Sequence, residues 1–181
     1  MEYKPFLFKD ENAHFLIPDK NKIEAFYIPV IGIMRKVYFN KKDLSAMQGL
    51  VQGDVEPVNL GKFLMWCCED GRLREFPLNF RASRINASRF GPKPDGKLEK
   101  PYFHLGIVGN VFITSMTKGG SPCSYHQTAF GSLIRAAKKV EVMHFHYDQG
   151  YEDIIQIDKD MSTFYPAELW WKLPKEGGIV L

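Results

Sequence analysis

The order of apolar and polar positions divides the chain into segments typical of strands and helices. Residues 63–68, Phe-Leu-Met-Trp-Cys-Cys, lack polar alternation, which predicts a central strand covered on both faces. Residues 25–30 and 36–39 are rich in β-forming residues, and three prolines interrupt the first thirty positions, so we expect edge strands there. Further strands are predicted over residues 55–60, 105–114, 140–147 and 153–157.

Helical spacing appears in three other segments. Asp43 is a candidate N-cap for a helix whose apolar residues recur at helical intervals up to Val51, and Gly53 is expected to end it. Residues 127–139 place their apolar side chains on one stripe, which predicts an amphipathic surface helix. Prolines bracket a short segment near the C-terminus that holds Trp170 and Trp171, and we expect a short helix there.

Glycine and proline mark the expected turns. Asp70-Gly71 follows the predicted central strand, and this dipeptide is typical of a type I′ turn that returns the chain as a hairpin. Residues 91–101 are rich in proline, glycine and lysine and predict an exposed, mobile loop. We therefore expect one α+β domain over residues 1–181, with a mostly antiparallel mixed sheet and two or three short helices packed on it.

Composition narrows the class of protein. With 181 residues, 45% of them hydrophobic and 14% aromatic, the chain has ample material for one core. No apolar run approaches the ~20 residues needed to cross a bilayer, and the first residues do not resemble a secretory signal. The three cysteines have neither disulfide-framework nor metal-site spacing. We expect a cytoplasmic protein with reduced thiols and no membrane association.

Charge is unevenly distributed along the chain. The net charge of +3 is too small to imply nucleic-acid binding by itself. Residues 72–100 are locally basic, however, and residues 148–160 are locally acidic. The basic segment is therefore where we look for anion recognition.

Four short blocks in this order resemble the family called domain of unknown function 3846. They are Leu-Val-Gln-Gly-Asp-Val-Glu from Leu50, Glu-Asp-Gly-Arg-Leu from Glu69, Pro-Leu-Asn-Phe-Arg-Ala from Pro77, and Ile-Val-Gly-Asn from Ile107. The resemblance covers about residues 43–114 and leaves the N-terminal strands and the C-terminal extension outside it. It implies a viral, phage or mobile-element origin. It implies no activity and no catalytic residue.

The sequence contains few residues or motifs typical of catalytic or metal-binding sites. His144 and His146 would share one face of a strand, but two ligands do not make a zinc site, and a solvated strand face explains them more simply. Cys67 and Cys68 lie in the predicted core strand, where thiols are usually inert. Phosphate-loop, dinucleotide and nucleophile-elbow motifs are absent. We expect no metal and no cofactor, and we favour a binding protein over an enzyme.

The best candidate site lies in the basic segment, in a stretch expected to be loop-like. It alternates guanidinium groups with amides and hydroxyls, and guanidinium donors match phosphate oxygens two at a time. The proposed ligand-binding residues are Asn79, Arg81, Ser83, Arg84 and Arg89, with Asn86 and Ser88 in the same stretch. Two alternatives stay open: a solvated arginine face, and an Asn79 carboxamide that ties a loop together instead of reading a ligand.

These residues favour a small binding protein that binds or sequesters a phosphate-bearing ligand such as a nucleotide. Aromatic side chains available to stack on a base are Trp66, Phe80, Phe90 and Tyr102. One alternative is a nucleic-acid-binding accessory protein, in which the lysines of residues 91–101 extend the basic track. Another is a structural or protein-interaction component of a viral assembly, either as a homo-oligomer or through C-terminal aromatics such as Phe164 and Tyr165.

Overall fold

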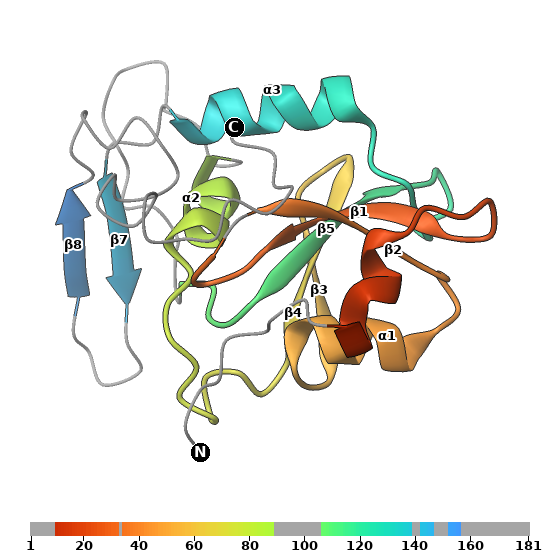
Figure 1. Ribbon diagram of the computed structural model, residues 1–181. Coiled ribbons are helices and arrows are strands. Elements are labelled where there is room, and N and C mark those ends of the chain that lie inside the picture. The colour runs from red at the N-terminus through yellow and green to blue at the C-terminus, as the bar shows by residue number, and fades with distance from the viewer. Residues whose placement is uncertain (1–9, 33, 89–105, 139–141, 147–151, 157–181) are drawn as a thin grey trace.

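The fold is built on an antiparallel sheet. The computed structural model describes residues 10–32, 34–88, 106–138, 142–146 and 152–156. Within them, six strands form one sheet in the order β2-β1-β5-β4-β3, with the short β6 paired to β5 (Figure 1). The strands are β1 (Ile23–Ile28), β2 (Arg35–Phe39), β3 (Val55–Asn59), β4 (Phe63–Cys68), β5 (Val111–Met116) and β6 (Pro122–Cys123).

Three α-helices accompany this sheet, and two further strands pair separately. The α-helices are α1 (Leu44–Val51), α2 (Phe80–Ser88) and α3 (Gln127–Lys138), and a short 3-10 helix, η1 (Asp10–Leu16), precedes β1. Strands β7 (Val142–His146) and β8 (Glu152–Gln156) form a two-stranded antiparallel sheet. The predicted α+β class is confirmed, as are the strands expected near residues 36–39, 140–147 and 153–157 and the helix expected over residues 127–139.

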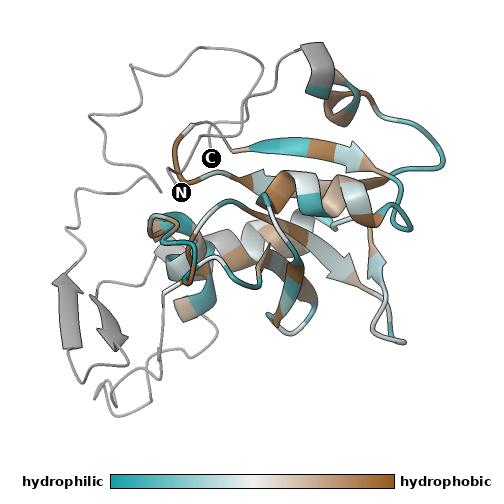
Figure 2. Cartoon of the chain, turned by 90° about the horizontal axis from the view of Figure 1, so that it is seen from below, coloured by the Kyte–Doolittle hydropathy of each residue, from teal (hydrophilic) through white to brown (hydrophobic). Residues whose placement is uncertain are grey.

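Helices cover both faces of the sheet (Figure 1). On one face, Phe26, Met65 and Ile113 pack with Ala82 and Ile85 of α2 and with Phe130 of α3. On the other, Tyr27 and Phe112 pack with Leu50 of α1 and with Phe15 of η1. Apolar and polar positions are interspersed along the elements when the chain is seen from below (Figure 2), as expected when each element turns one side to a core.

Strand β1 is an interior strand, which corrects the prediction of edge strands in this region. It pairs with β2 on one side, Ala25 opposite Val37, and with β5 on the other, Phe26 opposite Ile113. The prolines that suggested an edge lie outside the strand, so they remove no hydrogen bond from its ladder. Its residues Ala25 to Ile28 are all buried, as an inner strand between two cores requires.

The hairpin predicted at Asp70-Gly71 is wrong. The amide of Gly71 bonds the carbonyl of Cys68, and the amide of Arg74 bonds that of Asp70, so this segment coils in successive turns and joins no strand. Gly71 does not have a positive φ. A Cβ at this position would instead lie 3.1 Å from Cγ2 of Val108 and 3.2 Å from the carbonyl oxygen of Cys68. Glycine is needed here for close packing, a tertiary cause that a dipeptide does not reveal.

Helix α1 begins at the predicted N-cap and extends to Val51, but the residue that ends it is not the predicted glycine. The Oδ1 atom of Asp43 accepts a hydrogen bond from the amide of Ala46 at 3.0 Å, which is the expected N-cap. The left-handed residue after the helix is Gln52, with φ of 64°, and not Gly53. The amide of Gly53 then bonds the carbonyl of Gln48 at 3.1 Å.

Strand β3 forms one border of the sheet and carries a proline. Pro57 lies opposite Trp66 in the pairing of β3 with β4. An edge strand tolerates proline because only one side of its backbone must supply hydrogen bonds to a neighbour. The predicted loop over residues 91–101 and the predicted helix with Trp170 and Trp171 lie outside the described residues.

Candidate functional site

The predicted anion-binding stretch is helix α2 and not a loop. Asn79 precedes the first helical residue, and its Oδ1 accepts the amide of Ala82 at 3.0 Å, so it caps the helix. Ala82 and Ile85 anchor the helix in the core. Arg81, Ser83 and Arg84 lie within the helix, and Arg89 lies outside the described residues. These contacts give the segment a helical conformation although its composition is largely polar.

The Asn79 carboxamide is buried and makes several hydrogen bonds. Its Nδ2 donates to the carbonyl oxygen of Ile28 at 3.0 Å and to that of Gly109 at 2.9 Å. Together with the bond to Ala82, these contacts connect the start of α2, the end of β1 and the segment before β5. Of the two roles left open for Asn79, the structure provides the contacts for the structural tie.

Ser83 lies on the same side of α2, one turn after Asn79. Its Oγ accepts the amide of Ile107 at 2.9 Å and lies 3.3 Å from the carbonyl oxygen of the same residue. Residues four apart share one side of a helix. Asn79 and Ser83 therefore both face residues 107–109 and fasten them to α2.

The two described arginines of the predicted set lie on another side of the same helix. Arg81 and Arg84 are three residues apart and so occupy neighbouring turns. The Nη1 atom of Arg81 donates to the carbonyl oxygen of Gly32 at 3.0 Å, and its Nη2 donates to that of Pro29. Arg84 is only 7% exposed, and burial lowers the pKa of its guanidinium. The predicted set thus divides into an amide and hydroxyl side and an arginine side.

Phe80 shares the arginine side. It precedes Arg84 by four residues, and the residue is 51% exposed. Most of the other residues of this helix are buried, so an exposed aromatic ring at its start is unusual. Phe80 was one of the aromatic residues expected to stack on a base. Trp66, another of them, instead stacks on Phe112 within the sheet.

Asn86 of α2 is a buried polar residue that the sequence did not indicate as buried. It is 6% exposed, and its Oδ1 is buried without a hydrogen-bond partner. Asn86 follows Ser83 by three residues, on the amide and hydroxyl side. Its position in the polar stretch was visible in the sequence, but its burial was not.

A second polar cluster joins the blocks that carried the family resemblance. The Nη1 atom of Arg74 lies 2.6 Å from the carbonyl oxygen of Gln52 and 3.6 Å from Oδ1 of Asp70. The thiol of Cys68 donates to the same Asp70 oxygen at 2.9 Å. Gly53 lies beneath them, because a Cβ there would be 2.5 Å from Sγ of Cys68.

This cluster is built for packing and not for thiol chemistry. Burial is the first cause that raises the pKa of the Cys68 thiol to about 11, and the hydrogen bond to Asp70 is the next. Burial also raises the pKa of the Cys67 thiol, to about 12. Both thiols therefore stay protonated at neutral pH and are poor nucleophiles. The three cysteines form no disulfide.

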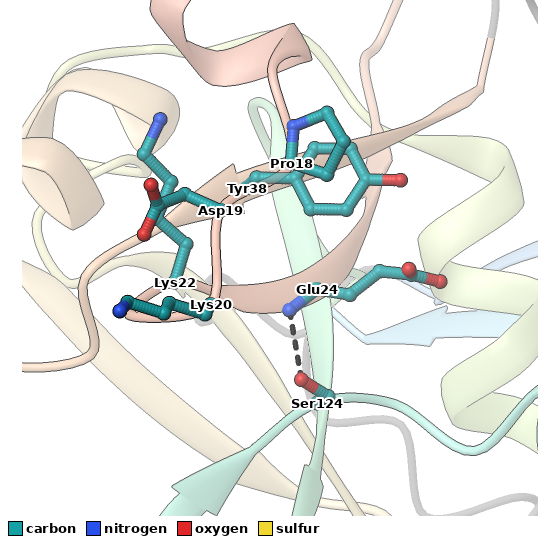
Figure 3. A pocket seen from close by; sticks show the side chains of 7 residues that line it. All are labelled: Pro18, Asp19, Lys20, Lys22, Glu24, Tyr38 and Ser124. Atoms are coloured by element: carbon teal, nitrogen blue, oxygen red, sulfur yellow. Dashed lines mark hydrogen bonds between the residues drawn. The ribbon is translucent and has the colours of Figure 1, made fainter.

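A hollow of about 350 Å³ opens near the start of β1 and is separate from α2 (Figure 3). Its lining residues are Pro18, Asp19, Lys20, Lys22, Glu24, Tyr38 and Ser124. The Nζ atom of Lys22 donates to the carbonyl oxygens of His14 and Ile17, and Glu24 pairs with Lys36 at 2.9 Å. In Figure 3 the carboxylate of Glu24 and the ammonium of Lys20 point in different directions. The hollow does not gather charges of one sign around one point, as an anion site requires.

The described part of the chain has neither a cluster of metal ligands nor a helix that could span a membrane. No group of three or more histidine, cysteine, aspartate or glutamate side chains is placed there to hold a metal ion. None of the helices in those residues has the length and apolar composition needed to span a bilayer.

The fold and site define an α+β domain in which an antiparallel sheet carries helices on both faces. One of these helices, α2, is largely polar and is buried against one face of the sheet. The chain belongs to the family described as Domain of unknown function (DUF3846), whose model matches residues 24–135. The predicted family is therefore confirmed. The match is longer than the expected residues 43–114 and includes most of β1 and most of α3. Comparison with curated proteins and with solved structures gives no match.

Proposed function

We propose that this domain binds a phosphate-bearing ligand, such as a nucleotide, on the arginine side of α2. The observation that carries the proposal is the pairing of Arg84 with Phe80 on successive turns of one helix side, with the guanidinium buried and the ring half-exposed. The guanidinium would meet the phosphate, and the ring would stack on the base.

Burial of the guanidinium supports an anionic partner. Removing a positive charge from water is costly, and burial already lowers the pKa of Arg84. A phosphate group at this place reduces that cost and uses the planar fork of N–H donors. Arg81, one turn earlier, adds a second positive charge to the same side of the helix.

The proposal assigns different roles to the residues of the predicted set. Arg84 and Arg81 are the two guanidinium groups that contact the phosphate. Asn79 and Ser83 hold the helix against residues 107–109 and do not contact ligand. Arg89 stays a predicted ligand-binding residue.

Calorimetric titration with ATP, GTP, cyclic AMP and inorganic phosphate tests the proposal. We expect at least one nucleotide to bind the wild type and the Arg84→Gln variant to bind it about tenfold more weakly, because one charge-assisted contact is lost. Phe80→Ala should weaken nucleotide binding without weakening phosphate binding. Arg135→Ala, which removes an equal charge from an exposed position of α3, is the matched control and should bind as the wild type does.

Equal affinities of wild type, Arg84→Gln and Arg135→Ala for every nucleotide would exclude this site. Arg84→Lys keeps the charge and removes the fork, so it distinguishes a bidentate contact from general attraction. If a single-stranded oligonucleotide binds far more tightly than any mononucleotide and its affinity falls steeply with salt, the domain is a nucleic-acid-binding protein instead.

A further inference from the structure

Residues 29–32, which we call the strap, follow β1 and are held by side chains from distant parts of the chain. Asn79 binds the carbonyl oxygen of Ile28 just before the strap. Arg81 donates to the carbonyl oxygens of Pro29 and Gly32, at the two ends of the strap. Asn110 accepts the amide of Val30 through its Oδ1 at 3.0 Å.

The hydrogen bonds that Asn110 and Arg81 make to the strap use different kinds of donor and acceptor. Asn110 is fully buried, and its Nδ2 also donates to Oε1 of Gln52 at 3.1 Å, which fixes its orientation. Arg81 holds the strap through both of its terminal nitrogens, and those nitrogens are the donors that a phosphate group engages most strongly. The strap and an anion on the arginine side of α2 therefore draw on the same donors.

We propose that the strap is a movable element that Arg81 holds closed in the free protein and releases when a phosphate-bearing ligand takes its terminal nitrogens. This inference rests on the proposed function. The guanidinium is charged in both arrangements, but a phosphate is an ionised acceptor that it can bind with two parallel hydrogen bonds, so the ligand competes with the two carbonyls for these donors. The released carbonyls of Pro29 and Gly32 then turn toward water.

The release requires little free energy because of where the strap lies. Ile31 is already 48% exposed, and Gly32 has φ of 114°, a region in which glycine moves without steric penalty. The tether from Asn110 to Val30 does not involve Arg81 and remains. The strap would thus pivot about Val30, and it would not detach from the sheet.

Amide hydrogen exchange at Ile31 and Gly32 tests the inference in two arms, and Val30, whose amide stays bonded to Asn110, is a reference within the strap that should not change. In the ligand-free arm, Arg81→Lys and Arg81→Ala should speed exchange at Ile31 and Gly32 about tenfold relative to wild type, because two tethers are lost together. Amides of β5 serve as an internal reference and should not change. The Arg135→Ala protein should exchange as the wild type does.

In the second arm, a saturating concentration of the nucleotide that binds best should speed exchange at the amides of Ile31 and Gly32 in the wild type. If strap exchange is unchanged in both Arg81 variants, or if exchange in β5 accelerates equally, Arg81 does not hold the strap. If the nucleotide binds in an Arg84-dependent manner and strap exchange stays constant or slows, the release is wrong and the proposed function stands. If no nucleotide binds, the proposed function fails and the ligand step fails with it.

Discussion

The Nδ2 atom of Asn79 lies 3.0 Å from the carbonyl oxygen of Ile28, so one side chain connects the start of α2 to the end of β1. These residues are far apart in the sequence and belong to different elements. The same nitrogen reaches Gly109, and the Asn79 oxygen caps α2. The start of α2, the end of β1 and the segment before β5 are therefore connected by a single buried amide.

Replacing Asn79 should strongly destabilise the domain. In Asn79→Ala, the groups bonded to its side chain lose their partners in a buried environment, so we expect the free energy of unfolding to fall by about 3 kcal/mol. Urea unfolding followed by circular dichroism measures the change. Asn40→Ala is the control, because the Asn40 side chain also accepts one backbone amide, that of Lys42, but is exposed, and its loss should cost less than about 1 kcal/mol. Equal losses in the two variants would contradict the assigned role.

Two glycines close in sequence should respond to alanine with opposite signs. At Gly53, a Cβ would lie 2.5 Å from Sγ of Cys68 and 2.6 Å from Nη1 of Arg74, so Gly53→Ala should destabilise the fold by about 2 kcal/mol. At Gly49, on an exposed position of α1, a Cβ would meet nothing within 4 Å, so Gly49→Ala should stabilise the fold by about 1 kcal/mol. Thermal melting of the two variants in parallel measures both changes. Changes of the same sign would show that the packing under Arg74 is not as described.

The thiols of Cys67 and Cys68 should resist modification while the protein is folded. Their pKa values are raised to about 12 and about 11, chiefly by burial, so almost no thiolate exists at pH 8. Cys123 is only partly buried and serves as the internal reference. We expect a disulfide reagent to modify Cys123 first and the other two only upon unfolding, as detected by mass spectrometry of the digested protein. Modification of all three thiols at one rate in native buffer would contradict the burial of Cys67 and Cys68.

The raised pKa values also fix the direction of a pH effect on stability. An unfolded thiol ionises near pH 9, whereas the folded ones keep their protons to about pH 11 and 12. The stability that depends on the protonated thiols is fully present below pH 9 and is lost as the pH rises through the folded values. The melting temperature should therefore decrease above pH 9. The decrease should be smaller in the Cys67→Ala/Cys68→Ala variant.

Features that depend on neighbouring residues in the sequence could be predicted. Asp43 caps α1 through a residue three positions later, and the apolar run of β4 reports its own burial on both faces. The amphipathic pattern of α3 gave nearly its full length. In each case the signal and the structure occupy the same few residues.

Features set by distant contacts could not be predicted in this way. Gly71 was assigned to a turn because of its neighbour Asp70, whereas its small size is needed against Val108. Helix α2 was expected to be a loop because its sequence is polar, and its hydrogen bonds go to Ile28, Gly109 and other main-chain groups that leave no side-chain pattern to read. The candidate site was located in the correct segment but with the wrong conformation and burial.

Pro57 has a consequence for how this domain behaves at high concentration. An outermost strand offers its free backbone to any neighbouring molecule that carries a similar strand, and continuous stacking of this kind leads to fibrils. The backbone nitrogen of Pro57 carries no hydrogen, so the row of backbone donors is interrupted in the middle of β3. This gap in the donors disfavours edge-to-edge pairing of two copies along this border of the sheet.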